Sequence, residues 1–250
     1  MKKLLSPPKS LFLYFLIFTF IPLLPLDSHG QMFSVGDRER ERGIPTNSLS
    51  LSLIAADFSF KGDPSAINAG IFEFSGVVPR IRYEAPGLEL FLSRGGSFTG
   101  LDDIDYFDMG FKIQRLIPLT GSEKVRLALP LLLKTSFTTV STDQPLGAVQ
   151  FEQATIDASA GLRLAVTFSE QFRFRSEATP FFGITFDTRR TSGTGSIFEF
   201  ESQNRFYFDG LFGSLGLSVG YDLEFRSYNV EEERFDYNLL GHNFLLGITF

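Results

Sequence analysis

Few residues of this chain have the types and spacing that catalysis requires. His242 is the one His beyond residue 30, and the alternation of its neighbours places it on an apolar face. Phe244, two residues later on the same face, offers that His no nucleophile. We therefore expect neither a catalytic residue nor an enzymatic activity.

Two acidic clusters are the candidates for cation binding. They are Asp102-Asp103-Ile104-Asp105 and Glu231-Glu232-Glu233. Carboxylates suit a divalent cation, but neither cluster has the Gly and Glu spacing of a calcium loop. The chain also has no Cys, which excludes a thiolate metal site and a disulfide framework. The sequence therefore predicts no metal and no cofactor, and both clusters are expected to be solvated loops.

A larger set of charged residues alternates with apolar ones beyond Leu49. Asp157 and Arg163, for example, lie on the opposite face from Ile156 and Leu162. Alternation over such lengths is typical of strands with one polar and one apolar face. The predicted polar face carries both signs of charge, on Asp108, Lys112, Arg126, Lys134, Asp157, Arg163, Arg173, Arg175, Glu177, Glu199, Glu201, Arg205, Asp222, Glu224 and Arg226.

The alternating segments predict about ten strands. No segment has apolar residues at the 3.6-residue spacing of an amphipathic helix. The predicted strands lie near 49–61, 70–84, 88–97, 104–117, 124–140, 151–168, 172–190, 197–208, 211–228 and 235–250. Tight turns, such as Ala85-Pro86-Gly87 and Asp209-Gly210, alternate with longer polar loops, such as Gly62 to Ala69. This asymmetry predicts an all-β fold: a closed, antiparallel, up-and-down transmembrane β-barrel.

Two details fit a ten-strand barrel poorly and leave eight strands open as an alternative count. The alternation slips between Leu53 and Ile54, where we expect a β-bulge. Pro79, Pro130 and Pro180 lie inside predicted strands, although a closed barrel has no free edge to hold a residue without an N–H.

The first thirty residues have the layout of a secretory signal peptide. Basic residues precede an apolar run from Leu11 to Leu26, and small residues follow at Ser28 and Gly30. We expect cleavage after Gly30, then a flexible periplasmic lead-in over residues 31–48 and a barrel over residues 49–250.

The charge of the chain excludes one class of partner. Removing residues 1–30 takes away three Lys and one Asp, and leaves 20 basic and 28 acidic residues. Nucleic-acid binding needs clustered Lys and Arg to neutralise phosphates. An acidic chain with mixed charges therefore predicts no nucleic-acid partner.

The last predicted strand carries a recognisable pattern. Four apolar side chains share one of its faces: Phe244, Leu246, Ile248 and Phe250. Apolar alternation before a terminal aromatic resembles the signal by which the outer-membrane assembly machinery recognises barrel proteins. Asn243 matches the polar position of that signal, whereas Leu245 replaces its usual Gly. Over residues 49–250 the chain resembles small bacterial outer-membrane β-barrel proteins of the porin-like superfamily, and it matches no specific subfamily.

The resemblance implies a place in the bacterial outer membrane, with membrane lipid and the barrel assembly machinery as partners. The predicted polar face would then line the lumen. Two functions stay open: a structural barrel filled with salt bridges, since unpaired buried ions are costly, or a narrow porin-like pore for a small solute or ion. The alternative is a secreted, soluble, lipocalin-like barrel that turns its apolar face inward and binds an apolar small molecule.

Overall fold

The computed structural model describes residues 47–66, 69–101, 103–142, 150–188, 194–230 and 235–250. All of them belong to the compact unit Val35–Phe250. The expected signal peptide and nearly all of the lead-in lie outside the described residues. No helix within the described ranges is long and apolar enough to cross a membrane.

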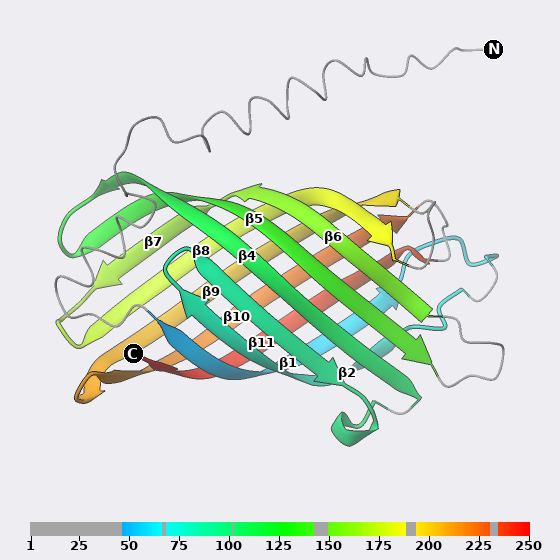
Figure 1. Ribbon diagram of the computed structural model, residues 1–250, viewed down its shortest axis with the longest axis horizontal. Coiled ribbons are helices and arrows are strands. Elements are labelled where there is room, and N and C mark those ends of the chain that lie inside the picture. Colours follow the sequence, from blue (N-terminus) through cyan, green and yellow to red (C-terminus); the bar gives the residue numbers. More distant parts are fainter. Residues whose placement is uncertain (1–46, 67–68, 102, 143–149, 189–193, 231–234) are drawn as a thin grey trace, which may run out of the picture. The chain divides into compact units, whose positions relative to one another are not determined.

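Besides turns, the described residues form antiparallel strands and the short 3-10 helix η3 (Ser97–Thr99), in the order shown in Figure 1. The strands are β1 (Ser48–Phe60), β2 (Phe74–Ala85), β3 (Leu88–Gly95), β4 (Ile104–Gly121), β5 (Val125–Thr142), β6 (Gln150–Ala160), β7 (Leu162–Thr167), β8 (Phe172–Asp187), β9 (Thr194–Phe212), β10 (Leu215–Val230) and β11 (Tyr237–Thr249).

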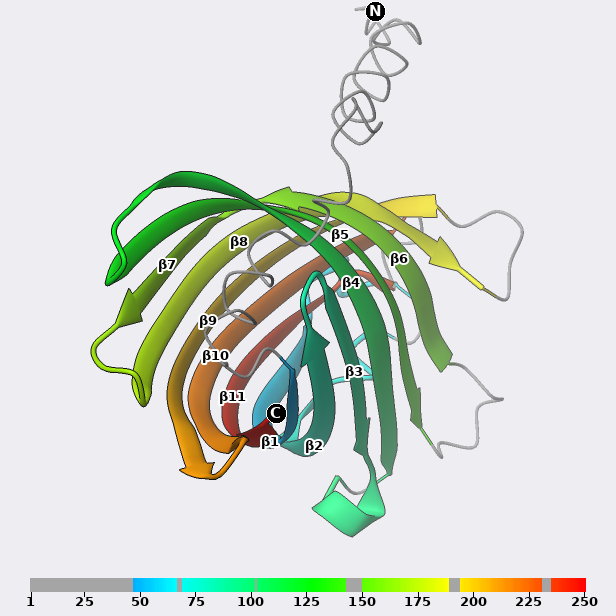
Figure 2. The same ribbon diagram turned by 60° about the vertical axis from the view of Figure 1, so that its left-hand side comes forward.

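The strands close into a ring, as the sequence predicts. β1 pairs with β2 on one side and with β11 on the other, from Ser48↔Thr249 to Phe60↔Tyr237. The pairing of β4 with β5 completes the circuit. Figure 2 shows β1 between β11 and β2 in the wall of the barrel. The closed ring removes the two free edges of the sheet, although residues 74–79 of β2 extend beyond the pairing with the shorter β3.

β6 and β7 are one strand interrupted at Gly161, so the ring has ten strands and the eight-strand alternative is wrong. The register with β5 and β8 is the same on both sides of the interruption. Pro130 on β5 accepts a hydrogen bond from the Gly161 N–H at 3.0 Å but has no N–H to return. Pro180 on β8 also lies beside this point. The prolines therefore interrupt the ladder without removing a strand.

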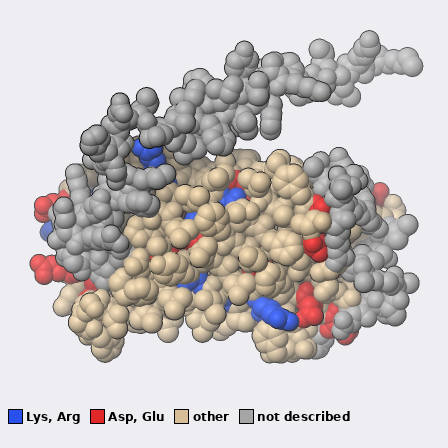
Figure 3. Space-filling model, viewed as in Figure 1, with Lys and Arg blue, Asp and Glu red and all other residues tan. Residues whose placement is uncertain are grey.

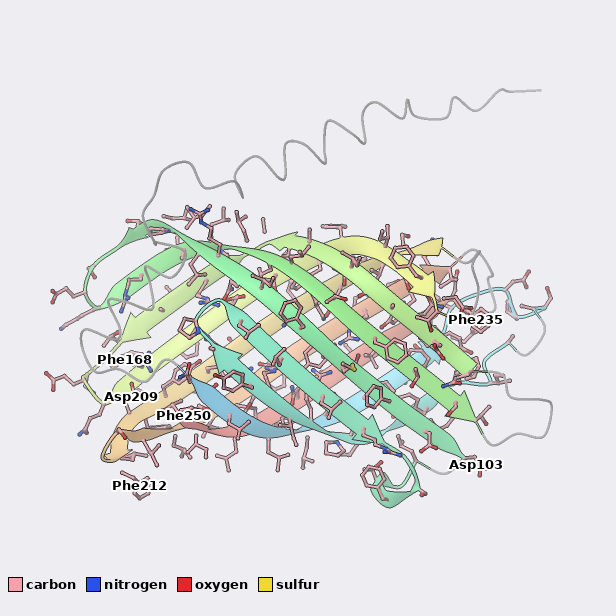
Figure 4. All side chains as sticks on the ribbon, viewed as in Figure 1. Asp103, Phe168, Asp209, Phe212, Phe235 and Phe250 are labelled. Carbon is pink, nitrogen blue, oxygen red and sulfur yellow. The ribbon has the colours of Figure 1, made fainter. Side chains whose placement is uncertain are left out.

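The two ends of the barrel differ in their connections. Four tight turns join β2 to β3, β4 to β5, β7 to β8, and β9 to β10, at the end that also holds Ser48 and Thr249. We call this the short-turn end, and the opposite end the long-loop end. Figure 4 shows Phe168, Asp209, Phe212 and Phe250 at the short-turn end, and Asp103 and Phe235 at the long-loop end.

One predicted turn is wrong. Asp209-Gly210 lies inside β9, and the chain reverses instead at Gly213-Ser214. A register irregularity between Leu215 and Leu217 takes up the extra residues of β9. Gly210 and Gly213 both have positive φ angles, 69° and 71°, which glycine adopts without steric cost. The Asp-Gly dipeptide therefore marks a residue with positive φ, but not the position where the chain reverses.

The barrel is polar inside and apolar outside. On β1, Ser50 and Ser52 are buried, whereas Leu51 and Leu53 are 59% and 54% exposed. Uncharged residues cover most of the middle of the face in Figure 3, and Asp and Glu lie mainly toward its two ends. A soluble lipocalin-type barrel has the reverse arrangement. The structure therefore does not favour the soluble alternative.

The bulge that we expected in β1 is absent. β1 pairs with both neighbours without a register shift, and its burial alternates regularly through Ile54. The inward residues themselves change, from Ser50 and Ser52 to Ile54, Ala56 and Phe58. The apparent phase slip therefore marks a change in the barrel's contents, from a polar section to an apolar section at the long-loop end.

Candidate functional site

The candidate site is the polar section of the barrel interior. Successive side chains of a strand point to opposite faces, so in a closed ring every second residue points into the lumen. Ion pairs join side chains from different parts of the wall throughout this section.

The central ion pair bridges opposite walls. Asp108 on β4 accepts hydrogen bonds from Arg226 on β10 at 2.9 and 3.0 Å. Four strands separate β4 from β10 in either direction around the ring. Arg80 on β2 adds a third bond to Asp108 at 3.0 Å, and Thr138 on β5 a fourth at 2.9 Å. Side chains from opposite walls therefore meet near the middle of the lumen.

Three carboxylates lie beside this pair: Glu199, Glu201 and Glu224, with one oxygen of each within 4.8 Å of the others. This spacing fits a cation, and cationic side chains of the chain itself occupy it. The Lys134 ammonium contacts Glu199 and bonds to Glu201 at 2.9 Å. Arg226 contacts Glu224. Internal ammonium and guanidinium groups thus fill the role that a metal would take.

The ion pairs continue toward the short-turn end as an alternating series. Lys112 contacts Glu201 and lies 3.0 Å from Glu89, which lies 3.4 Å from Arg82. Arg82 bonds to Asp222 at 2.6 Å.

Asp222 also contacts Arg205, which lies 3.7 Å from Glu84, and Glu84 accepts a bond from Arg175 at 2.7 Å. Each acid has bases on both sides of it in this series. The mutual pairing offsets the cost of removing so many charges from water.

Two aromatic rings lie within the charged section. The Phe91 ring centroid is 4.6 Å from the guanidinium carbon of Arg80 and 5.4 Å from the Lys134 ammonium. The Phe181 centroid is 5.5 Å from that same ammonium. The faces of these rings attract cations and also fill space that water would otherwise occupy.

A layer of buried apolar side chains lies inside the long-loop end, and we call it the aromatic layer. Phe58 stacks on Tyr237 with centroids 4.7 Å apart, and Phe151 meets Phe58 edge-on at 5.2 Å. Phe72 comes from the connection between β1 and β2, and it packs against Tyr237 at 5.9 Å. The connection therefore contributes a buried side chain to the layer.

Polar contacts fix the same connection to the wall. The Phe60 N–H donates to Glu73 at 2.9 Å, and the Lys61 ammonium donates to Ser227 at 2.8 Å. Burial lowers the pKa of Lys61, and the nearby carboxylate of Asp236 opposes that shift. These contacts fix both ends of the connection at the long-loop end of the barrel.

The structure places the predicted polar-face residues as follows. Fully buried in the interior are Asp108, Lys112, Lys134, Asp157, Glu177, Glu199, Glu201, Arg205, Asp222, Glu224 and Arg226. Arg163, Arg173 and Arg175 are partly buried near the short-turn end and pair with Glu177, Asp209 and Glu84. Arg126 is partly exposed on β5.

Sequence reasoning missed several members of the site. They are Arg80, Arg82 and Glu84 on β2, Glu89 on β3, Asp209 on β9, and the aromatic layer. Alternation of Arg80, Arg82 and Glu84 with Ile81 and Tyr83 is visible in the sequence and would have found the β2 residues. Asp209 was missed because it was assigned to a turn.

The other candidates lie away from this interior. The His242 ring is on the outer face, where its Nδ1 is 2.8 Å from the Tyr221 hydroxyl. Asp103 lies in the connection before β4, whereas Asp102 and Glu231-Glu232-Glu233 lie outside the described residues. Phe244, Leu246, Ile248 and Phe250 are exposed on the outer face near the junction of β11 with β1.

Comparison with known proteins finds likeness in structure only. No protein-family model matches the chain, and no curated protein matches it. The outer membrane protease OmpT from Escherichia coli is 9% identical, with 82% of this chain and 97% of that chain covered and a TM-score of 0.47. The β domain of the Bordetella autotransporter BrkA is 10% identical over 82% and 99% of the two chains, with a TM-score of 0.33.

The attachment invasion locus protein Ail of Yersinia pestis is 9% identical over 82% of this chain and 97% of its own, with a TM-score of 0.27. None of these likenesses reaches a TM-score of 0.5. The assignment of a transmembrane β-barrel fold therefore stands on the closed antiparallel ring, its polar interior and its apolar exterior.

We predict that Arg226→Met destabilises the barrel by about 3–5 kcal/mol, because it leaves Asp108 and Glu224 buried with too little positive charge. The measurement is urea unfolding of the refolded protein in detergent. Arg94→Met, at an exposed position on β3, is the matched control and should change stability by no more than about 0.5 kcal/mol. Equal stability of the two variants would show that the interior pairs contribute little.

Proposed function

We propose that this protein is an integral outer-membrane barrel with a closed interior, which serves as a structural element and not as an open pore. The Asp108–Arg226 contact carries the proposal, because it joins opposite walls of the ring at 2.9 Å. A barrel of about ten strands has little interior beyond what side chains fill. Here ion pairs fill its middle and the aromatic layer fills its long-loop end.

The outer surface supports the membrane location. Large apolar side chains are exposed on every side of the ring, for example Leu51 on β1, Leu92 on β3, Ile156 on β6 and Val219 on β10. In water such a surface would be prone to aggregation, whereas lipid tails accommodate it.

Phenylalanine supplies an aromatic border at the short-turn end, where outer-membrane barrels carry a girdle. Phe168 stacks on Phe172 at 5.0 Å, and Phe172 stacks on Phe208 at 5.2 Å. Phe212 and Phe250 are also exposed at this end (Figure 4). These rings take the place of the Trp that the chain lacks.

Export and assembly form part of the proposal. The segment 1–30 would direct the chain across the inner membrane and be removed after Gly30. The exposed side chains of Phe244, Leu246, Ile248 and Phe250 would be available to the assembly machinery before β11 pairs with β1. The long-loop end would then face the exterior of the cell. The short-turn end would face the periplasm, because it holds both ends of the barrel, Ser48 and Phe250.

A narrow pore is the second candidate. Asp157 Oδ1 and Gln153 Nε2 lie buried on the inner face of β6 without a hydrogen-bond partner among the described residues. Ordered water or a passing ion would satisfy them. Glu199 Oε2 on β9 and Asn243 Oδ1 on β11 are buried without such a partner as well, whereas the cross-lumen pairs occupy the centre.

Planar-bilayer recording distinguishes the two candidates. We expect no steady single-channel steps from the refolded wild-type protein, because paired side chains and the aromatic layer block the lumen. A water-filled porin inserted under the same conditions serves as the positive control. Regular conductance steps from the wild type would contradict the closed barrel and favour the pore.

The membrane location predicts a penalty for charge on the outer face. Ile156 is 50% exposed there, in the middle of β6. Ile156→Arg should make folding into lipid bilayers less favourable by about 2–4 kcal/mol. Phe98→Arg, at an exposed residue of η3 outside the strands, should have little effect. If both variants fold equally well into bilayers, the outer face of β6 does not contact lipid tails.

A further inference from the structure

A row of polar side chains crosses the outer face of β8, β9, β10 and β11. Ser176 pairs in register with Asn204, and Asn204 with Tyr221. Ser202 and His242 both pair with Leu223. The five polar residues, Ser176, Ser202, Asn204, Tyr221 and His242, form what we call the polar row. The side chains of all five point to the outer face, because their neighbours along each strand point into the barrel.

The polar row lies within the apolar surface and not at its border. On β9 it is flanked by Phe198 and Phe200 on the long-loop side and by Phe206 and Phe208 on the short-turn side. On β11 it is flanked by Leu240 and Phe244, which are exposed. If the barrel spans a membrane as proposed, the polar row faces the hydrocarbon layer.

Hydrogen bonds within the polar row satisfy only part of it. Ser176 Oγ donates to Asn204 Oδ1 at 2.8 Å, and Asn204 Nδ2 lies 3.4 Å from Ser202 Oγ. Tyr221 and His242 share one bond of 2.8 Å. A tyrosine and a neutral histidine have one donor hydrogen each, so either tautomer leaves one donor unused in that pair. The Ser202 hydroxyl and the second N–H of Asn204 are further donors.

Lipid tails cannot accept these hydrogen bonds, and lipid headgroups lie outside the flanking apolar residues. Polar groups that face hydrocarbon without partners are costly, and in membrane proteins such groups bond across interfaces between spanning segments. The polar row therefore needs an occupant that brings both donors and acceptors into the apolar layer.

We propose that the polar row is the centre of an interface with a second copy of this chain. Serine, asparagine, tyrosine and neutral histidine each offer both a donor and an acceptor, so the row can bond to its own image. A two-fold interface requires such self-complementarity, because the same patch meets itself. A row of one charge would repel its copy, and none of the five residues carries a permanent charge.

Aromatic side chains surround the polar row and suit the same occupant. Phe174 and Phe206 lie 4.8 Å apart at its short-turn side, and Phe182 and Phe198 lie 5.1 Å apart at its long-loop side. Tyr221 also packs against Phe244 at 5.3 Å. Interfaces concentrate binding energy in a few central side chains, Tyr among them, and the surrounding contacts exclude water. The proposal rests on the membrane location of the barrel.

Cysteine cross-linking tests the interface without background, because the chain has no Cys. Ser202→Cys introduces one thiol into the polar row, and Thr135→Cys places one on the outer face of β5 as a matched control. Cells that produce each variant are treated with a short bis-maleimide, and the outer-membrane fraction is isolated. We expect a cross-linked dimer from Ser202→Cys and monomer from Thr135→Cys.

Purified protein in lipid nanodiscs provides the second measurement. Tyr221→Phe, which removes one hydroxyl and keeps the ring, should weaken dimerisation by about tenfold, because each lost bond occurs twice in a two-fold interface. Tyr83→Phe, on the outer face of β2, should leave dimerisation unchanged. Heat-dependent migration on gels verifies that every variant is folded.

Three results would overturn the inference: a wild-type monomer in nanodiscs, equal cross-linking of both cysteine variants, or cross-linking of Ser202→Cys to a different protein only. Fractionation of the same cells separates this failure from a failure of the proposed function. Folded barrel in the outer membrane without a dimer contradicts the interface alone. Recovery of the barrel from the soluble fraction contradicts the membrane location.

Discussion

The structure depends on one constraint: charges that face the interior of a narrow barrel must pair with one another. Side chains alternate along each strand, so a wall with an apolar exterior sends its polar residues inward. The interior has too little room to hydrate them separately, and an isolated buried ion costs several kcal/mol. The alternating acids and bases from Glu199 to Arg175 meet this constraint. The same pairs occupy the middle of the lumen, which is the reason that we propose a closed barrel and not a pore.

The alternation of polar and apolar residues predicted the fold well, because it is a local property of each strand that does not depend on how the barrel closes. The ten strands, the tight turn after Ala85 and the inward position of Asp108 all follow from a period of two and from turn-forming residues. The errors came from places where local signals compete. Asp209-Gly210 has the composition of a tight turn, but it lies inside β9, and the reversal uses Gly213 instead.

The partners inside the barrel could not be predicted, because they depend on distance across the lumen. Asp108 and Arg226 are far apart in sequence and lie on opposite walls, so no pattern within a strand reveals their contact. The aromatic layer was hidden for a related reason. Phe58 breaks the polar alternation of β1, and only the closed ring shows that it meets Phe151 and Tyr237. The outward polar row likewise becomes visible only when the registers of four strands are combined.

Access of water-soluble reagents to the interior tests the central claim most directly. Ser136 is buried on the inner face of β5 between Lys134 and Thr138, and Ser97 lies in η3 outside the barrel wall. A membrane-impermeant maleimide should label Ser97→Cys at once in the folded protein, and should label Ser136→Cys only after heat unfolding. Rapid labelling of Ser136→Cys in the folded barrel would show a water-filled lumen and contradict the closed interior.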